Sequence, residues 1–294
     1  MTAFNFLEPS ASGMISFHTM TPDDQGFFLG LIKMVGWGLT DTDYRRMLAF
    51  SPEGIFKATL GGEDVGIVVT VDYGEMAWIG NLIVVPDMRG RGIGEALMRR
   101  AMEHLEGRGV RTIRLDGVQK AIPLYRRLGF RDEYWSLRYT GRASRSPVAY
   151  AEPMRKSDLD AVTVLDEAFF KGRRGHLLRW VYDRFPDLCF ASWKDSELTG
   201  FIMAKDGSDS LKVGPWICRP GYEAAAETLL RSLMNMRVGE DVWVGCPEGN
   251  RSGVAVLERN GFTSLPSSLR MCYGDCGVRE DVEGIYGLGG PDKG

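Results

Sequence analysis

The feature that most constrains this fold is an internal repeat with a spacing of 134 residues. Shifting the first half of the chain by that amount superposes many of its turn-forming and apolar residues on identical residues of the second half. Glycine and proline fix turns for steric reasons, so a run of such matches predicts two copies of one fold. The matched pairs include Met20 with Met154, Asp24 with Asp158, Gly38 with Gly172, Pro52 with Pro186, Gly66 with Gly200, Gly80 with Gly214 and Pro86 with Pro220.

The length of the chain agrees with two domains. Its 294 residues, 44% of them hydrophobic, suffice for two cores of about 140 residues each. The glycine-rich stretch 284–294 is expected to be mobile. We expect a flexible N-terminal tail over 1–14, a first domain over 15–141, a linker over 142–149, a second domain over 150–276 and a C-terminal tail over 277–294.

Composition indicates an ordinary cytoplasmic protein. The net charge of -3 gives no reason to expect a nucleic-acid partner. The chain contains no apolar run approaching 18 residues and does not open with a basic leader, so we expect no membrane partner. With only three histidines and no CxxC spacing, we expect no metal site, and we interpret all cysteines as reduced thiols. These cysteines are Cys189, Cys218, Cys246, Cys272 and Cys276.

The periodicity of the first copy predicts the element order β-α-α-β-β-β-α-β-α-β. Only the strands that flank the third helix can be joined by a parallel crossover, so we expect an α/β fold with a mixed, mostly antiparallel sheet flanked by helices. The expected strands are 15–20, 55–60, 65–71, 78–85, 110–115 and 130–139, and the expected helices begin near residues 21 and 42 and cover 95–106 and 121–128.

A glycine-rich turn over 89–94 joins the fourth strand to the third helix. Its glycines let the backbone approach an anion closely, and the helix that follows aims its N–H groups at it, which predicts a pyrophosphate cradle. A dinucleotide-binding fold would need an acidic residue about 20 residues further on, and Asp116 lies too far downstream. The repeat places 223–228 at the corresponding position, with no glycine and two glutamates. We therefore expect the second copy to keep the fold and lose the nucleotide site.

This element order, together with VVPDMRGRGIG and LYRRLGF, resembles the GNAT superfamily of acyl-CoA-dependent N-acyltransferases. The resemblance is strong over 15–140 and extends to 150–275 through the fold repeat only. It implies acetyl-CoA as the cofactor, with the coenzyme A pyrophosphate on the backbone of the glycine turn and the pantetheine arm along the fourth strand. The implied cofactor-binding residues are Leu82, Ile83, Val84, Arg89, Gly90, Arg91, Gly92, Ile93, Gly94 and Glu95.

The resemblance also assigns a proton donor. A tyrosine in the LY pair of these enzymes commonly protonates the departing thiolate, and Tyr125 occupies that position. Many members carry an asparagine seven residues earlier. Here that residue is Val118, whereas the second copy retains Asn250.

Acyl transfer to nitrogen requires a neutral amine, which calls for a base. Deprotonating a lysine-like amine at pH 7 costs about 4.6 kcal/mol, and an α-amine about 1.3 kcal/mol. Asp116, at the end of the fifth strand where the thioester must enter, is the first candidate for the general base, and Glu75 is the second, with Asp72 beside it. Trp37 lies where this fold usually builds its acceptor wall, and its indole face suits an ammonium group.

We therefore expect an N-acetyltransferase that moves an acetyl group from acetyl-CoA to a primary amine by direct attack in a ternary complex. The first domain would be catalytic, and the second would shape the acceptor site. A small-molecule amine is favoured over a protein as the acceptor. The alternative is an acyl-CoA-sensing regulatory module without turnover, in which the cofactor sets the geometry between the domains. The sequence leaves the acceptor, the acyl chain and the oligomeric state open.

Overall fold

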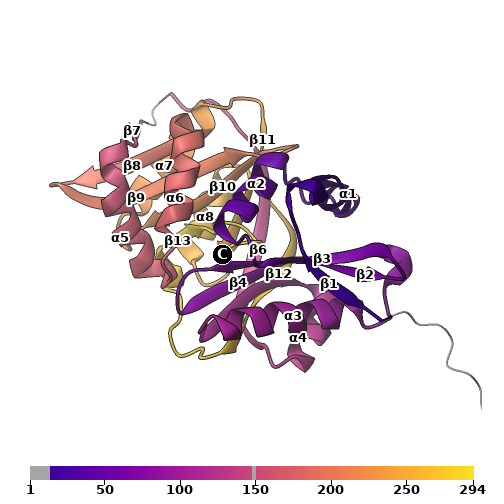
Figure 1. Cartoon of the computed structure of the whole chain (residues 1–294). Helices are drawn as coiled ribbons and strands as arrows, with labels where there is room; N and C mark the ends of the chain where they lie inside the picture. The colour runs from indigo at the N-terminus through magenta and orange to yellow at the C-terminus, as the bar shows by residue number, and fades with distance from the viewer. Residues whose placement is uncertain (1–13, 148–149) are drawn as a thin grey trace, which may run out of the picture.

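The computed structural model describes residues 14–147 and 150–294. The expected N-terminal tail, apart from Met14, and two residues of the expected linker lie outside the described residues. Figure 1 shows the first half and the second half side by side, with helices on the outside and strands running through the middle.

The first half has the element order that the sequence predicts, with element ends that differ by a few residues. Its elements are β1 (Ser16–Thr19), α1 (Gln25–Val35), α2 (Asp41–Phe50), β2 (Ile55–Leu60), β3 (Glu63–Asp72), β4 (Met76–Val84), α3 (Ile93–Gly107), β5 (Thr112–Val118), α4 (Ile122–Arg127) and β6 (Arg131–Arg142).

The second half repeats this order, which confirms the two copies of one fold. It adds one short strand, β13, after the repeat. Its elements are β7 (Glu152–Pro153), α5 (Leu159–Phe170), α6 (Gly175–Arg184), β8 (Cys189–Lys194), β9 (Glu197–Asp206), β10 (Leu211–Cys218), α7 (Glu223–Asn235), β11 (Asp241–Pro247), α8 (Arg251–Arg259), β12 (Thr263–Gly274) and β13 (Ile285–Gly287).

One continuous sheet joins the halves because their last strands are exchanged. Its central order is β4-β5-β12-β6-β11-β10, so β12 of the second half pairs with β5 of the first half. Strand β6 pairs with β12 on one side and with β11 on the other. All neighbours in this central part are antiparallel except β4–β5 and β10–β11, which are parallel, as expected for strands that flank the crossover helix. The exchange ties the halves together with backbone hydrogen bonds.

Helices cover both faces of the sheet. In the first half α3 packs on one face through side chains such as Leu97 and Leu105, and α1 and α2 pack on the other face through Phe28 and Met47. In the second half α7 and α8 cover the face that corresponds to α3, and α5 and α6 cover the opposite face. The sheet face that α1 and α2 cover in the first half therefore continues, across the exchanged strands, into the sheet face of the second half.

The C-terminal stretch 284–294 is ordered and buried, so the expectation of a mobile tail was wrong. Tyr286, Asp292 and Lys293 are 1%, 5% and 4% exposed. Strand β13 pairs with β10, and Figure 1 marks residue 294 in the middle of the molecule, between the two halves. Glycine content suggested mobility, but the segment buries apolar side chains and pairs its backbone, which fixes it.

The expectation that all five cysteines are reduced thiols was wrong for one pair. Cys272 and Cys276 form a disulfide, because β12 ends at Gly274 in a left-handed turn that brings their Cα atoms to 6.1 Å. Cys189, Cys218 and Cys246 are free thiols, as expected. Burial raises the pKa of each of these three thiols to about 12.

Candidate active site

The two parallel strands at the centre of the first half part from each other. β4 and β5 pair only where Met76–Trp78 faces Thr112–Arg114. Further along, Asn81 adopts a positive φ of 52°, and the register between β3 and β4 shifts around it, which turns β4 away from β5. A cavity of about 720 Å³ opens between the parted strands, within the size range of small-molecule sites.

The glycine turn lies at one end of this opening. Gly90 and Gly92 have φ values of 75° and 81°, which side chains disfavour, and α3 begins directly after them. Among the described residues, the backbone N–H groups of residues 90–95 form no intramolecular hydrogen bond. These donors and the positive end of the α3 dipole face the same solvent region. Such an arrangement suits a phosphate group.

The strand residues expected to hold the pantetheine arm line the cavity. Leu82, Ile83 and Val84 are all part of its wall, together with Arg89, whose Nε donates to the Val84 carbonyl at 3.0 Å. The edge of β4 that faces β5 has no partner strand beyond Trp78. Its backbone is therefore open to an extended ligand, and the residues present fit coenzyme A.

Tyr125 lies in the same wall. Its ring packs on β5 so closely that a Cβ at Gly117 would come within 3.0 Å of it. Burial raises the pKa of the Tyr125 phenol, so the hydroxyl stays protonated near neutral pH. Within the described residues this hydroxyl forms no hydrogen bond, which leaves it able to donate to a ligand.

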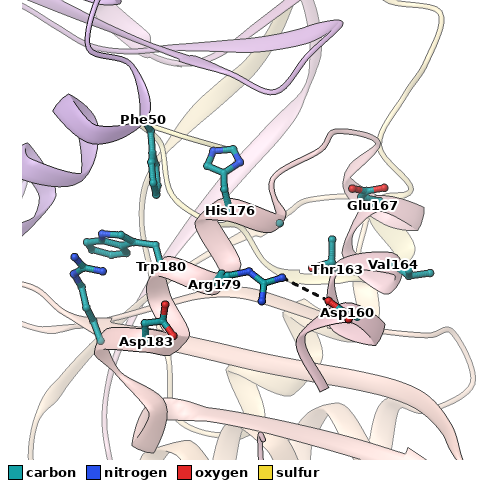
Figure 2. A pocket seen from close by; sticks show the side chains of 11 residues that line it. Phe50, Asp160, Thr163, Val164, Glu167, His176, Arg179, Trp180 and Asp183 are labelled. Atoms are coloured by element: carbon teal, nitrogen blue, oxygen red, sulfur yellow. Dashed lines mark ion pairs between the residues drawn. The ribbon is translucent and has the colours of Figure 1, made fainter. Parts of the chain in front are cut away.

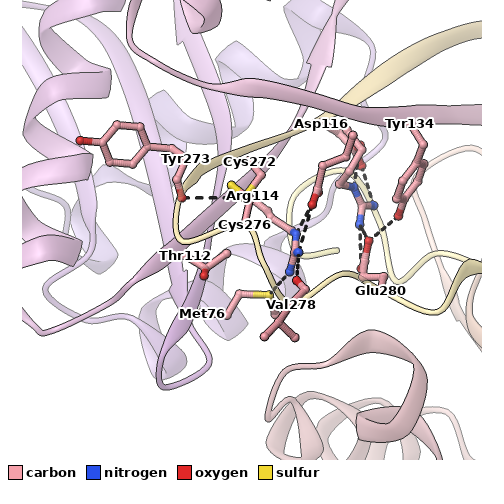
Figure 3. A network of polar contacts seen from close by, with 12 residues as sticks. Met76, Thr112, Arg114, Asp116, Tyr134, Cys272, Tyr273, Cys276, Val278 and Glu280 are labelled. Atoms are coloured by element: carbon pink, nitrogen blue, oxygen red, sulfur yellow. Dashed lines mark hydrogen bonds and ion pairs between the residues drawn. A yellow bond between two sulfur atoms is a disulfide. The ribbon is translucent and has the colours of Figure 1, made fainter.

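Asp116 lines the cavity, but its carboxylate is already engaged. Its side chain is 1% exposed. Arg270 donates to both carboxylate oxygens at 3.1 Å, and the Ser136 hydroxyl donates to Oδ1 at 2.7 Å. Arg270 also donates to Glu280. Figure 3 shows Tyr134 beside Glu280, whose carboxylate accepts from the Tyr134 hydroxyl. Both carboxylate oxygens of Asp116 therefore already accept hydrogen bonds from the protein.

The other candidate bases lie outside the cavity. The Glu75 side chain is 80% exposed and 3.7 Å from Arg111, and Asp72 accepts from Arg108 at 3.0 Å. Neither carboxylate belongs to the cavity wall. Trp37, in contrast, is half-buried in that wall, where the acceptor side was expected.

The opposite wall comes from the second half, and the sequence singled out none of the residues that form it. Lys205, Lys212 and Trp243, on β9, β10 and β11, face the cavity together with residues 289–293. This segment lies directly on β4, because a Cβ at Gly80 would approach the Cα of Asp292 to 2.8 Å. The exchanged strands bring these groups beside the first half, and no local pattern encodes that contact.

A buried ionic cluster joins this wall to α2. Lys205 Nζ is 2.7 Å from Asp43, and Asp292 accepts from Arg46 and from Lys293, each at 2.7 Å. Burial opposes ionisation of Asp292, but attraction by Lys293 and Arg46 outweighs it and leaves its pKa far below the ordinary value. Burial lowers the pKa of Lys293 to about 8, because Asp292 offsets only part of the desolvation. Three cations face two carboxylates here, and the surplus of positive charge favours both shifts.

The corresponding opening in the second half is filled by the chain itself. β10 and β11 pair over Leu211–Val213 and Val242–Val244 and then part, as β4 and β5 do. Strand β13 occupies the gap, where it pairs with β10. The Leu288 N–H donates to the Gly245 carbonyl of β11 at 2.7 Å, and the side-chain amide of Asn250 donates to the Ile285 carbonyl at 2.9 Å.

The start of α7 also differs from the glycine turn of the first half. Glu223 lies at its first position and accepts from the Gly221 N–H at 3.0 Å. A carboxylate therefore occupies the place that a phosphate would need. In the described part of the second half, β13 and Leu288 thus occupy the opening, and a carboxylate lies at the start of α7.

A further hollow of about 750 Å³ lies over α5 and α6 and reaches the end of α2. Figure 2 shows His176 beside Phe50, and Asp160 paired with Arg179 at 3.5 Å. None of the residues expected in the site from sequence lines this hollow. It has no connection with the glycine turn.

A parted parallel pair of strands, followed by a helix that begins at a glycine turn, defines an acyl-CoA-type transferase fold, present here in tandem. The profile of the Acetyltransferase (GNAT) family matches residues 21–130, and that of the Acetyltransferase (GNAT) domain matches residues 162–287. The chain belongs to the GNAT acetyltransferases and has two GNAT domains.

Three of the similar proteins match most of the length of this chain. Holothin acyltransferase of Pseudoalteromonas sp. (strain SANK 73390) is 24% identical over 257 residues, which cover 86% of each chain. A Pyrococcus horikoshii protein provisionally described as an acetyltransferase superposes with a TM-score of 0.79 at 23% identity, over 100% of this chain and 99% of its own. A tandem GNAT protein from the clavulanic acid biosynthesis pathway superposes with a TM-score of 0.62 at 17% identity, over 89% of this chain and 98% of its own.

Proposed function

We propose that the protein transfers an acetyl group from acetyl-CoA, bound by the first domain, to a primary amine of a small molecule in the cavity between the halves. The observation that carries this proposal is the opening between β4 and β5, which is empty of protein in the first domain and leads from the glycine turn to the acceptor wall. Acetyl-CoA supplies an activated thioester there. The N–H groups of residues 90–95 hold its pyrophosphate, and the free edge of β4 pairs with its pantetheine arm.

Tyr125 acts as the proton donor for the departing thiolate. Its hydroxyl stays protonated because burial raises its pKa, and it has no competing intramolecular partner among the described residues. As the amine nitrogen bonds to the acetyl carbon, the carbon–sulfur bond breaks, and the phenol proton passes to sulfur. The amine nitrogen then loses a proton to solvent, and the phenolate takes up a proton from solvent.

We propose that the acceptor amine arrives neutral rather than being deprotonated by a side chain. Each of the four carboxylates in the cavity wall is paired with a cation, in the pairs Asp116 with Arg270, Asp209 with Lys212, Asp241 with Arg142 and Asp292 with Lys293. Asp116 then acts as a positioning residue that anchors Arg270. An amine of low basicity is favoured as the acceptor, because losing its proton costs about 1.3 kcal/mol for an α-amine and about 4.6 kcal/mol for a lysine-like amine at pH 7.

The second domain supplies the acceptor wall and binds no acyl-CoA of its own. This follows if β13 and Leu288 keep the opening between β10 and β11 filled and Glu223 repels phosphate at α7. The sensing alternative requires a movable arrangement of domains. The exchange of β6 and β12 opposes it, since separating the halves would break three ladders of backbone hydrogen bonds.

The test is coenzyme A release from acetyl-CoA, measured against primary amines of graded pKa. We expect release with part of the panel and none with a Gly92→Glu variant, which places a carboxylate in the glycine turn. Binding of acetyl-CoA without release for any amine would refute the enzyme and support the sensing module.

A further inference from the structure

Arg138 is a cation in the cavity wall without a partner. It lies on β6, between Leu265 of β12 and Gly245 of β11, at the centre of the exchanged strands. Its side chain lines the cavity, and its Nε is buried. Among the described residues the Arg138 guanidinium forms neither a hydrogen bond nor an ion pair. Burial lowers the pKa of Arg138, and attraction to Asp116 offsets part of that shift.

The other cations of this wall that are buried or partly buried each have a carboxylate partner. Lys205 is 2.7 Å from Asp43, and Lys293 is 2.7 Å from Asp292. Lys212 is 3.0 Å from Asp209. Arg89 and Lys120 also line the cavity but are exposed, so water can solvate them. Arg138 therefore differs from its neighbours: it is only partly exposed, its Nε is buried, and no anion among the described residues pairs with its guanidinium, which leaves the guanidinium available to an anionic ligand.

Asp116 is the anion that attracts Arg138, but both of its carboxylate oxygens already accept hydrogen bonds from Arg270. The ionic cluster across the cavity contains three cations and two carboxylates, Arg46, Lys205 and Lys293 against Asp43 and Asp292. The Nε and one terminal nitrogen of Arg46 are themselves buried without a partner. The charged residues that line the cavity are six cations and four carboxylates, so its lining as a whole carries a surplus of positive charge.

The phosphates of the cofactor are poorly placed to supply the missing anion. Two strands, β5 and β12, separate β6 from β4, after which the glycine turn follows. Three strand spacings amount to roughly 14 Å. The N–H groups of residues 90–95, which are unpaired among the described residues and lie beyond β4 as seen from Arg138, are better placed to bind the cofactor phosphates.

We propose that Arg138 binds an anionic group of the acceptor, so that the substrate is a primary amine that also carries a carboxylate or a phosphate. A guanidinium can bind either group through two parallel hydrogen bonds, which orients the acceptor as well as attracting it. Trp243 and Thr140, which face each other across β11 and β6, line the cavity next to this position and would contact the body of the acceptor. This inference rests on the proposed acetyl transfer and specifies its substrate class.

The experiment compares matched amines with and without an anion. The probe pairs are 4-aminobutyrate with butylamine for the carboxylate, and phosphoethanolamine with ethanolamine for the phosphate. For each pair the ratio of kcat/KM values is measured in the wild type, in Arg138→Met, in Arg138→Lys and in Arg145→Met. The last variant removes an exposed arginine beyond the end of β6 and serves as the control.

We expect the wild type to prefer the anionic member of at least one pair by about 10- to 100-fold, the range for a charged hydrogen-bonded contact. Arg138→Met should abolish that preference, Arg138→Lys should retain part of it, and Arg145→Met should keep it. A preference that survives in Arg138→Met, or the absence of any preference in the wild type, overturns the inference while leaving acetyl transfer intact.

A second readout separates the inference from the proposed function. Binding of the same probes is measured by calorimetry with the wild type and with Arg138→Met, whether or not any probe is acetylated. Tighter binding of an anionic probe that is lost in Arg138→Met supports the site even if no turnover occurs. Equal binding of both members of each pair overturns it.

Discussion

The filled opening of the second domain predicts that the protein binds one acyl-CoA per chain, at the first domain. The perturbation that tests this is Gly92→Glu. Gly92 has a φ of 81° and precedes α3, so the new carboxylate would lie where the pyrophosphate approaches. At roughly 5 Å from a phosphate charge and an effective dielectric between 20 and 80, the repulsion is about 1 to 3 kcal/mol. We expect the affinity for coenzyme A to fall by about 10- to 100-fold.

The structure also gives the cost of opening the second site. A coenzyme A molecule between β10 and β11 would have to displace Ile285, Tyr286 and Leu288, which are 1%, 1% and 3% exposed. Exposing three such side chains costs about 1.5 to 3 kcal/mol each, or roughly 5 to 9 kcal/mol in total. Even half of the upper value weakens binding by about three orders of magnitude. The second site should therefore stay closed at any practical concentration.

The assay is isothermal titration of the full chain with coenzyme A. We expect a stoichiometry of one in the wild type and an affinity weaker by about 10- to 100-fold in Gly92→Glu. The matched control is Ala224→Glu, which adds the same charge at an exposed position of the second domain that corresponds to Gly90 in the repeat. Two equivalents in the wild type, or unchanged affinity in Gly92→Glu, would refute the reasoning.

Three further outcomes are expected. Tyr125→Phe should lower kcat by about 10²- to 10⁴-fold without changing the affinity for coenzyme A, and an unchanged kcat would remove the phenol from the mechanism. The pH midpoint of kcat/KM should follow the pKa of each amine in the panel, whereas a midpoint common to all amines would reveal a titrating base on the enzyme. Asp43→Asn should lower the free energy of unfolding in urea by about 3 to 5 kcal/mol at pH 7, because it strands the buried Lys205. Burial opposes ionisation of Asp43, but Lys205 and Arg46 outweigh it and lower its pKa. Its contribution is therefore complete above the unfolded value near 3.9 and declines as the pH falls through the lower folded value, so the difference between Asp43→Asn and wild type should narrow below about pH 4. A difference that is constant with pH would contradict this assignment.

Much of the fold was predictable because its signals are local. The turn residues of the repeat, the alternation within β2 to β4 and the glycine turn before α3 each reflect the conformational preferences of a few consecutive residues. The parting of β4 and β5 was also expected, from the need to admit a thioester. The expected cofactor residues Leu82 to Val84 and the expected proton donor Tyr125 line one cavity for the same reason, since they belong to elements whose order the sequence determines.

The surroundings of the candidate bases were less predictable, because the residues that pair with a carboxylate can come from distant parts of the chain. Asp116 was expected at the end of β5 and lies there, but its partner Arg270 is 154 residues away. Glu75 was chosen for its place beside β4, yet it points to solvent beside Arg111. No local sequence pattern indicates either pairing. The sequence therefore identifies the carboxylates but not the side chains that pair with them.

By itself, the sequence determined that this protein is two copies of one α/β fold and that the glycine turn occurs in the first copy and not in the second. Tertiary structure decided how the copies combine. The exchange of β6 and β12 brings Arg138, Lys205 and Trp243 to the acceptor cavity, and the glycine-rich stretch expected to be mobile instead closes the second domain and lines the first. The physical reason is that turns and helix starts depend on a few neighbouring residues, whereas strand exchange and the burial of a terminal segment depend on surfaces that exist only after both halves have folded.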